Sequence, residues 1–311
     1  MTARSMTDEE FALYQRMVSA LGIGDFSSLL VHYTSIATLE NILDSRELWF
    51  GRLSDLKDTA ECDHFIDGVL RNASSLLPIA DPDVIAATMQ HFRQVMRDET
   101  FVSSWCEYSL AEPEGQLGMW REFGDDGMGV GIVADSSQFL ASAIKREHLS
   151  FGVYSARMEY VHKDRVSAYA NDMFRRVANS DIPNADVMRK FMLAALVLSK
   201  APCVKHHSYA EEREIRFMRM SPALNGGVAS PTVPRFATVR GQQREFAALP
   251  LKDYPEHALD LRVERILKRV VVGPQGDRAG REQRVKALLA KHGLGHVPVV
   301  VSDIPWRGQA A

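Results

Sequence analysis

The chain of 311 residues is 46% hydrophobic and 25% charged, with a formal net charge of −3. Its length allows one large domain or two small ones, with a sizeable core in either case. The near balance of charges gives no indication of a surface that coats nucleic acid, although a local basic groove stays open. Three widely spaced cysteines, Cys62, Cys106 and Cys203, exclude a disulfide framework and favour a reducing compartment.

No targeting or membrane segment is apparent in the sequence. The N-terminal residues lack the apolar segment of a secretory signal. The longest apolar stretch, FMLAALVL at 191–198, is too short to span a bilayer. We therefore expect a cytoplasmic protein that does not act at a membrane.

The first half of the chain mixes predicted helices and strands. Helical periodicity predicts helices over 7–21, 35–43, 58–77, 82–96 and 115–124. Runs of β-forming residues predict strands over 28–33, 47–51, 100–107 and 128–135. Glycines in the last of these strands permit the close approach of another backbone.

The second half of the chain also mixes predicted strands and helices. We expect, in chain order, a hairpin over 148–161, helices over 163–178 and 184–199, a strand over 211–220, a long loop or irregular hairpin over 221–250, and a strand–helix–strand unit over 267–303 with its helix at 278–292. No domain boundary stands out. The sequence therefore predicts a single α+β domain over 1–311, with a mixed β-sheet core and several inserted helices.

Several common catalytic motifs are absent. The glycine-dense stretch GDDGMGVG at 124–131 precedes a strand, whereas a dinucleotide-binding loop follows one. There is no GxSxG sequence, and no cysteine lies in a nucleophile context. The pair His206–His207 lies near Cys203, but no second cluster offers enough further ligands, so we expect no metal site.

The segment Glu212-x-Glu214-x-Arg216 carries the first candidate chemistry. On a strand these three side chains share one face, and Ile215 and Phe217 take the opposite, core-facing side. Two neighbouring carboxylates raise the pKa of one of them, while Arg216 offsets part of the repulsion. Such a pair can stabilise a sugar cation and orient a hydroxyl group. A solvated strand face with alternating charges explains the same pattern.

The sequence His32-Tyr33-Thr34 ends a predicted strand and carries the second candidate. A histidine in this position either makes a structural hydrogen bond or holds a ribose hydroxyl through its ring nitrogens. The aromatic residues are equally open to two interpretations: Trp49 and Trp105 belong to the core or form a stacking wall for an aromatic ring.

These motifs resemble a bacterial family catalogued as domain-of-unknown-function family 2971. The resemblance rests on VHYTSIATLENILDSRELWFGRLSDLKDTAEC (31–62), VSSWCE (102–107), MWREFGDDGMGVGI (119–132), YAEEREIRF (209–217) and LKRVVVGP (267–274). It covers roughly residues 30–275. A more distant resemblance, on the His-Tyr-Thr opening and the later Glu-x-Glu, is to ADP-ribosyltransferases.

The distant resemblance implies an ADP-ribosyltransferase-like fold and a role for each motif. His32 and Thr34, with Tyr33 between them, would hold the adenosine-side ribose of NAD. Glu214 would hold the nicotinamide ribose and stabilise its oxocarbenium ion, with Arg216 beside it, and Glu212 would orient the acceptor. Trp49 or Trp105 would stack on nicotinamide.

The resemblance also implies the function. We expect an enzyme that cleaves NAD and transfers ADP-ribose to a macromolecular acceptor, protein or nucleic acid, as a toxin, effector or antiphage defence protein. NAD serves as substrate, and no metal is expected. Two alternatives stay open: a non-enzymatic nucleotide-sensing or interaction module, and a metal-dependent nuclease or hydrolase that uses the glutamate pair.

Overall fold

The computed structural model describes residues 29–56, 62–71, 82–139, 151–178, 197, 200–222, 224 and 227–306. The helix expected at 7–21 and nearly all of the helix expected at 184–199 lie outside these residues. The strands are β1 (Leu29–Thr34), β2 (Glu47–Arg52), β3 (Thr100–Tyr108), β4 (Val130–Asp135), β5 (Val153–Arg157), β6 (Glu159–Val161), β7 (Val204–His206), β8 (Glu214–Met220), β9 (Val233–Val239), β10 (Gln242–Pro250), β11 (Asp253–Tyr254), β12 (Leu259–Asp260), β13 (Leu267–Val272) and β14 (Val299–Val301).

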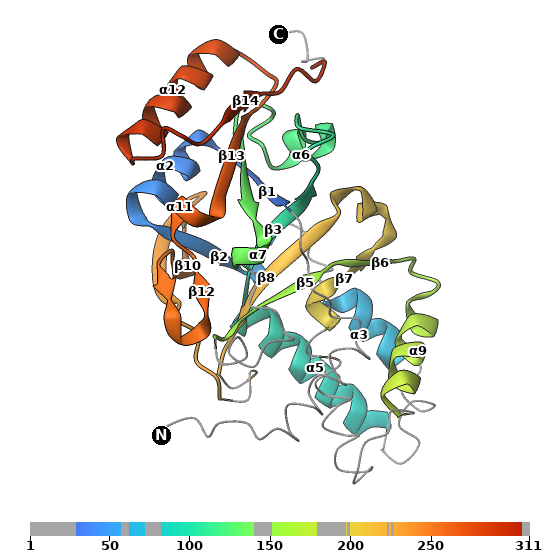
Figure 1. Cartoon of the computed structure of the whole chain (residues 1–311). Helices are drawn as coiled ribbons and strands as arrows, with labels where there is room; N and C mark the ends of the chain where they lie inside the picture. Colours follow the sequence, from blue (N-terminus) through green and yellow to red (C-terminus); the bar gives the residue numbers. More distant parts are fainter. Residues whose placement is uncertain are drawn as a thin grey trace.

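The helices lie between these strands and cover both faces of the sheet (Figure 1). They are α2 (Ile36–Ser45), α3 (Asp63–Leu70), α5 (Pro82–Glu99), α6 (Leu117–Glu122), α7 (Ser136–Phe139), α9 (Val166–Ala178), α11 (Val263–Ile266) and α12 (Arg278–Lys291), with short 3₁₀ segments η1 (Leu53–Asp55), η2 (Ala201–Cys203), η3 (His207–Glu212) and η4 (Pro255–His257). The predicted α+β class with a mixed sheet and inserted helices is confirmed.

A ten-stranded sheet branches at β3. Along one edge, β3 pairs with β8 from Thr100 to Cys106, and β8 pairs in turn with β5. Along the other edge, β1 pairs with the end of β3, up to Val31–Cys106, and β2 pairs near its start, at Gly51–Val102. The helix α2 connects β1 to β2, so the chain leaves this edge of β3 and then returns to it.

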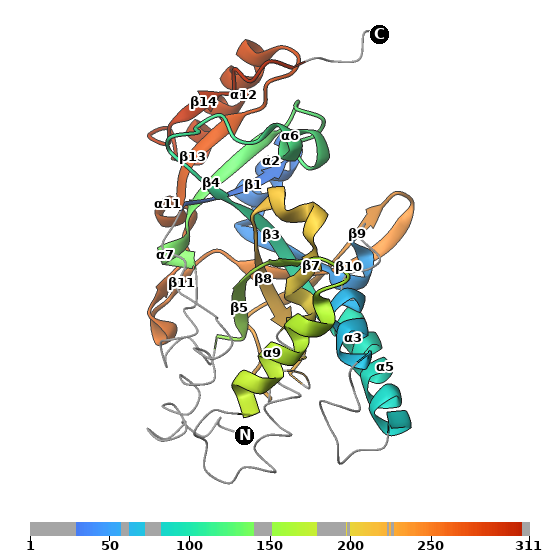
Figure 2. The same cartoon turned by 90° about the vertical axis from the view of Figure 1, so that its right-hand side faces the viewer.

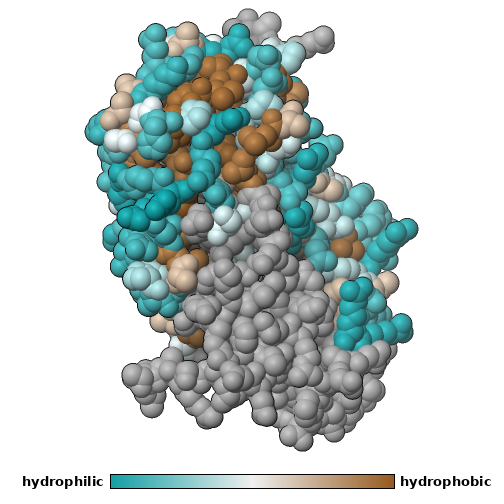
Figure 3. All heavy atoms as spheres, in the orientation of Figure 1, coloured by the Kyte–Doolittle hydropathy of each residue, from teal (hydrophilic) through white to brown (hydrophobic). Residues whose placement is uncertain are grey.

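The branch beyond β1 continues through β4, β13 and β14, and the branch beyond β2 continues through β10 and β9. The strand–helix–strand unit predicted at the C-terminal end is confirmed, because β13 and β14 are parallel neighbours connected by α12. Figure 3 shows hydrophobic residues gathered in the upper part of the molecule, where Figure 1 places β13, β14 and α12.

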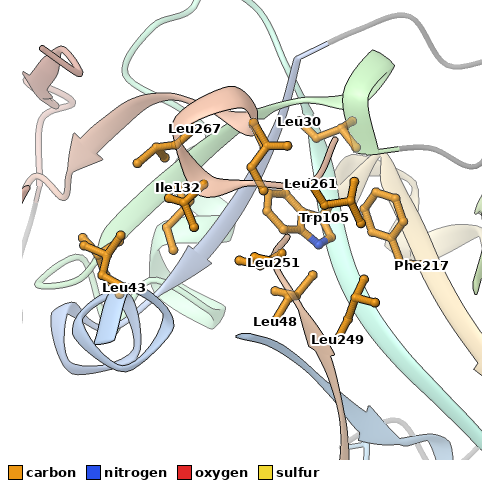
Figure 4. Close-up of a cluster of buried hydrophobic side chains, with 14 of the residues drawn as sticks. Leu30, Leu43, Leu48, Trp105, Ile132, Phe217, Leu249, Leu251, Leu261 and Leu267 are labelled. Atoms are coloured by element: carbon orange, nitrogen blue, oxygen red, sulfur yellow. The ribbon is translucent and has the colours of Figure 1, made fainter. Parts of the chain in front are cut away.

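Alternating residues of the strands face two apolar layers. On one face, α2, α11 and α12 cover a large core in which Trp105 lies among leucines from several strands and loops (Figure 4). On the other face there are two separate clusters. One contains side chains of α3, α5 and α9 with Val102 and Met218, and the other contains Trp120 of α6 with Val31 and Cys106.

Two predicted segments differ from the structure. The hairpin predicted over 148–161 is not formed by the described residues 151–161: β5 pairs with β8, whereas β6 pairs with β7 in a parallel pair. Residues 221–250 contain a regular hairpin of β9 and β10, which projects from the body of the molecule in Figure 2. Its two-residue turn has φ of 51° at Arg240 and 79° at Gly241, a conformation that matches the twist of hairpin strands.

Among the described residues, no helix combines the length with the apolar character that crossing a membrane requires.

Candidate functional site

A cleft of about 630 Å³, lined by both charged and apolar side chains, lies on the face of the sheet that carries two separate apolar clusters. Residues of β3, of β7 and of the start of β8 form its floor, and α6, η3 and the β9–β10 hairpin contribute to its walls. The lining comprises Val31, His32, Tyr33, Asp55, Leu56, Ser104, Cys106, Met119, Glu122, Phe123, Lys205, Tyr209, Glu212, Glu214, Arg216, Val239, Arg240 and Arg244. The cleft therefore brings together both motifs that the sequence singled out.

Buried ion pairs form the floor of the cleft. Arg216 Nε donates to Glu214 Oε1 at 2.7 Å, and Arg216 Nη1 donates to the carbonyl oxygen of Pro202 at 2.8 Å. Lys205 Nζ donates to Glu214 Oε2 at 2.7 Å and to Glu212 Oε2 at 2.9 Å. Because Glu214 is only 3% exposed and Arg216 only 1%, these charges depend on one another for compensation.

The predicted placement of Glu212 on the strand is wrong. Glu212 ends the 3₁₀ segment η3, and Arg213 then adopts a left-handed conformation with φ of 46°. The strand begins only at Glu214. Lys205 nevertheless holds both carboxylates on the same cleft, so a turn rather than strand alternation brings them together.

The strand itself follows the predicted alternation from Glu214 onward. Ile215 and Phe217 lie in the large core at 0% and 1% exposure, opposite Glu214 and Arg216. The Glu214 backbone N–H donates to the hydroxyl of Tyr160 at 2.8 Å, which fixes the start of β8 to β6.

The two carboxylates have opposite pKa shifts. Burial tends to raise the pKa of Glu214, but Arg216 and Lys205 outweigh it and lower the pKa to about 2. Burial raises the pKa of Glu212, and the charge of Glu214 adds to this effect, against the influence of Lys205. One raised pKa of the pair agrees with the sequence-based expectation, and the second carboxylate stays ionised.

His32 lies beside the part of β3 between the residues that pair with β1 and those that pair with β2. Its Nδ1 donates to the carbonyl oxygen of Ser104 at 2.9 Å, at the position where no pairing of β1 or β2 with β3 is described. The ring contacts that of Trp105 at a tilt of 38°, with 5.2 Å between centroids. Burial lowers the pKa of His32, which favours the neutral imidazole, and Nε2 is the accepting nitrogen when Nδ1 donates to Ser104.

Tyr33 and Thr34 have different surroundings. The hydroxyl oxygen of Tyr33 accepts a hydrogen bond from the backbone N–H of Gln116 at 2.9 Å, and its ring contacts Trp120 edge-on. Tyr33 borders the cleft. Thr34 ends β1 opposite Val130 and is not among the residues that line the cleft.

The aromatic residues expected to stack on nicotinamide lie outside the lining of the cleft. Trp105 is buried in the core on the opposite face, where it contacts Phe217 (Figure 4). Trp49 is 38% exposed on β2 and stacks on Phe246 of β10. Strand alternation places Trp105 on the opposite face of the sheet from Glu214. Trp49 lies opposite the core residues Leu48 and Phe50 but is not among the residues that line the cleft, so neither tryptophan has the expected position.

Sequence reasoning missed several lining residues. Phe123 and Tyr209 are exposed aromatic side chains at 44% and 40%, and both line the cleft. Arg240 and Arg244 reach it from the β9–β10 hairpin, where Arg244 Nη1 donates to the carbonyl oxygen of Asp55 at 3.1 Å. Lys205 was missed because no local pattern distinguishes a lysine that will bridge two glutamates from a solvated one.

The metal-dependent alternative finds little room in this arrangement. Lys205 Nζ occupies the position between Glu212 Oε2 and Glu214 Oε2, where a divalent cation bound by both carboxylates would lie. Cys203 is buried, and its thiol donates to the sulfur of Met218 at 3.7 Å. Cys62, Cys106 and Cys203 are all buried.

The fold and site define an α+β protein with a cleft that has buried ion pairs on its floor and lies over a branched mixed sheet. Residues 119–217 match the model of a family described as "Protein of unknown function (DUF2971)". This segment runs from α6 through Phe217 and includes Lys205, Glu212, Glu214 and Arg216, while His32 and the β9–β10 hairpin lie outside it. The match supports the first resemblance over a shorter range than 30–275.

The other comparisons add no relative. No curated protein and no solved structure matches the chain significantly. The more distant resemblance to ADP-ribosyltransferases therefore receives no support from them.

Proposed function

We propose that the cleft binds NAD and that the protein transfers ADP-ribose from NAD to a macromolecular acceptor. The observation that carries this proposal is that His32 and Glu214, far apart in the sequence, border one cleft together with Glu212. Two separate structural roles would require no such proximity, whereas a single NAD molecule must contact both motifs.

The divergent pKa shifts of Glu212 and Glu214 support distinct roles in this reaction. The ionised Glu214 stabilises the positive charge that develops on the nicotinamide ribose as the C1′–N bond breaks. Nicotinamide leaves with the electron pair of that bond, and the acceptor nucleophile forms a new bond to C1′. Glu212, whose pKa is raised, orients the acceptor and takes its proton.

The remaining lining suits the other parts of NAD. The lone pair of His32 Nε2 is an acceptor for a ribose hydroxyl, because Nδ1 already donates to Ser104. Phe123 and Tyr209 offer exposed rings for stacking on nicotinamide or adenine. Arg240 and Arg244 at the hairpin suit the diphosphate, since one guanidinium group can donate two parallel hydrogen bonds to phosphate oxygens.

One observation favours a second function, a nucleotide-binding module without turnover. Both carboxylate oxygens of Glu214 already accept hydrogen bonds, Oε1 from Arg216 and Oε2 from Lys205. A glutamate held in this way has a structural role that is independent of catalysis. The two functions share the ligand and differ only in whether NAD is consumed.

Incubation of the purified chain with NAD tests both. Mass spectrometry for free nicotinamide, and for protein or nucleic acid carrying an added ADP-ribose group, detects turnover, and isothermal titration with NAD measures binding. Turnover supports the transferase, and binding without nicotinamide release supports the module. Absence of both overturns the proposal.

The variant Glu212→Gln makes the test specific, because Glu212 is more exposed than Glu214 and its loss disturbs the floor least. We expect it to lower turnover by roughly 10²-fold, as removal of a reaction-stabilising group does. Glu264→Gln is the matched control, since Glu264 pairs with Arg46 on the surface, 48% exposed. An equal loss of turnover in Glu212→Gln and Glu264→Gln contradicts the catalytic role assigned to Glu212.

A further inference from the structure

A histidine cluster lies outside the cleft, at one end of the small parallel sheet. In the pair β6–β7, Val161 lies opposite His206. Parallel strands bring their carboxyl ends to the same edge. His162 directly follows β6, His206 ends β7, and His207 begins η3, so the topology itself brings three imidazoles to one edge.

The side chains of this His162–His206–His207 cluster are close together. Each contributes one ligand nitrogen, and these three atoms lie within 4.8 Å of one another. The ring centroids are 4.5 Å apart for His162–His207 and 4.6 Å apart for His206–His207. His162 and His206 are partly buried, and His207 is exposed.

Contacts from two further residues orient the cluster. Asp164 Oδ2 lies 3.1 Å from Nδ1 of His162. The backbone N–H of Asp164 also donates to His162 Nδ1 at 3.3 Å. When Nδ1 carries the proton instead, it donates to the Asp164 carboxylate and Nε2 is left as the metal ligand, which is the usual support of a metal-binding histidine. From α3, His64 Nε2 donates to the carbonyl oxygen of Val161 at 2.8 Å and so holds the end of β6.

Open space adjoins the cluster. A surface cavity of about 620 Å³ is lined by His162, His207, Asp164, Tyr160 and Arg165. A metal held by three imidazoles there would keep a coordination position for water or another small ligand, as sites with three protein ligands do.

We propose that His162, His206 and His207 bind one divalent transition metal ion, with Zn²⁺ as the favoured species. Imidazole nitrogen is a preferred ligand of this class of metal. Tetrahedral ligands at a Zn–N distance of 2.0–2.1 Å lie roughly 3.3 Å apart. The nitrogens therefore need to approach one another by small side-chain rotations, since their present separations are at most 4.8 Å.

Metal binding at this position affects the cleft through η3. His206 Nδ1 accepts a hydrogen bond from the backbone N–H of Ser208 at 3.3 Å, which caps η3. Ligation through Nδ1 takes the accepting lone pair, and ligation through Nε2 requires a proton on Nδ1. Either way the cap is lost at the start of the segment that carries Tyr209 and Glu212.

The test is metal binding by the full chain, purified without a polyhistidine tag. Zn²⁺ is titrated in competition with a chromophoric chelator, and Co²⁺ is added as a spectroscopic probe of tetrahedral coordination. We expect one metal ion per chain and a visible Co²⁺ absorption typical of nitrogen ligands. His207→Ala is the principal variant, because this exposed residue can be truncated without disturbing the core.

We expect His207→Ala and His162→Ala each to lower the affinity for Zn²⁺ by at least about tenfold, since even second-shell changes have effects of this size. His296→Ala, which alters an exposed histidine far from the cluster in the sequence, is the control and should bind like the wild type. Absence of stoichiometric binding, or equal binding by the His207→Ala chain, overturns the proposal. Neither readout depends on NAD.

Discussion

Arg216 and Glu214 are neighbours on one face of β8, and Arg216 Nε donates to Glu214 Oε1 at 2.7 Å. Residues two apart on a strand share a face but are separated by about 7 Å, so the long guanidinium side chain folds back along the strand. Lys205 binds the other oxygen of the same carboxylate. Glu214 therefore has a structural role whether or not it also has a catalytic one.

We predict that Glu214→Gln destabilises the fold by roughly 3–5 kcal/mol, because it removes the carboxylate that pairs with the buried Arg216 and leaves the buried Lys205 with Glu212 as its carboxylate partner. A glutamate on an open strand face would have predicted almost no change. Urea unfolding followed by circular dichroism measures the difference in free energy. The control Glu264→Gln removes an exposed pair and should change stability by less than about 1 kcal/mol. Equal stabilities of Glu214→Gln and wild type would contradict the ion-pair network.

Stability should fall on acidification, with a contribution from Glu214. Its pKa is about 2 in the folded chain and about 4.3 when unfolded, so folding favours the ionised form. The corresponding stabilisation, about 3 kcal/mol, is fully present above pH 5 and is lost as the pH falls towards 2. Glu212, whose pKa is raised, acts with the opposite sign.

Urea midpoints between pH 7 and pH 3 measure this dependence in wild type and in Glu214→Gln. The difference in urea midpoint between wild type and Glu214→Gln should become smaller as the pH falls. A constant difference over this range would show that Glu214 is not the responsible group.

His32 should serve both the fold and the ligand, and two substitutions separate these roles. His32→Ala removes the hydrogen bond to Ser104, with an expected loss of about 1–3 kcal/mol in stability. His32→Asn places an amide nitrogen near the position of Nδ1 but lacks Nε2, so it should recover part of the stability. NAD affinity, measured by calorimetry, should be reduced in both variants. An Asn variant with wild-type affinity would remove His32 Nε2 from the ribose contact.

The aromatic wall of the cleft should be formed by Phe123 and Tyr209. We predict that Phe123→Ala and Tyr209→Ala each weaken NAD binding by roughly 0.5–1.5 kcal/mol through lost stacking, while stability changes little because both rings are exposed. Phe236→Ala is the matched control, since this ring is 62% exposed on β9 and is not among the residues that line the cleft. Calorimetric titration with NAD compares the three. Equal affinities would place the ligand elsewhere.

Local sequence patterns predicted those parts of the fold that local physics determines. The strand β1, the helix α2 and the strand β2 follow from clear changes of hydrophobic period, and Ser35 caps α2 by accepting a hydrogen bond from the N–H of Thr38. The unit from β13 to β14 was predictable for the same reason. The partners of β5 and β6 were not, because two adjacent β-forming runs favour a hairpin locally, and only tertiary pairing sends them to β8 and β7.

The candidate site was predictable in its two motifs and not in its surroundings. The positions of His32 and Glu214 carried a recognisable pattern. Trp105 was misassigned because the period of a strand leaves open which of its faces meets the core. Phe123 lies within the stretch 119–132 that carries the family resemblance, but nothing local in that stretch indicates that its ring lines a cleft. Arg244 comes from a segment without a distinctive pattern and reaches the cleft through long-range packing.

Arg213 has a consequence for the comparison of related sequences. With φ of 46°, it forms the turn between η3 and β8 and allows both flanking glutamates to reach one cleft. Valine, isoleucine and threonine rarely adopt this conformation, and proline is excluded from it. A chain with one of these four residues between its two glutamates must place the first glutamate differently, however well the Glu-x-Glu spacing is kept. The middle residue of the motif, rather than the spacing alone, therefore indicates which sequences share this geometry.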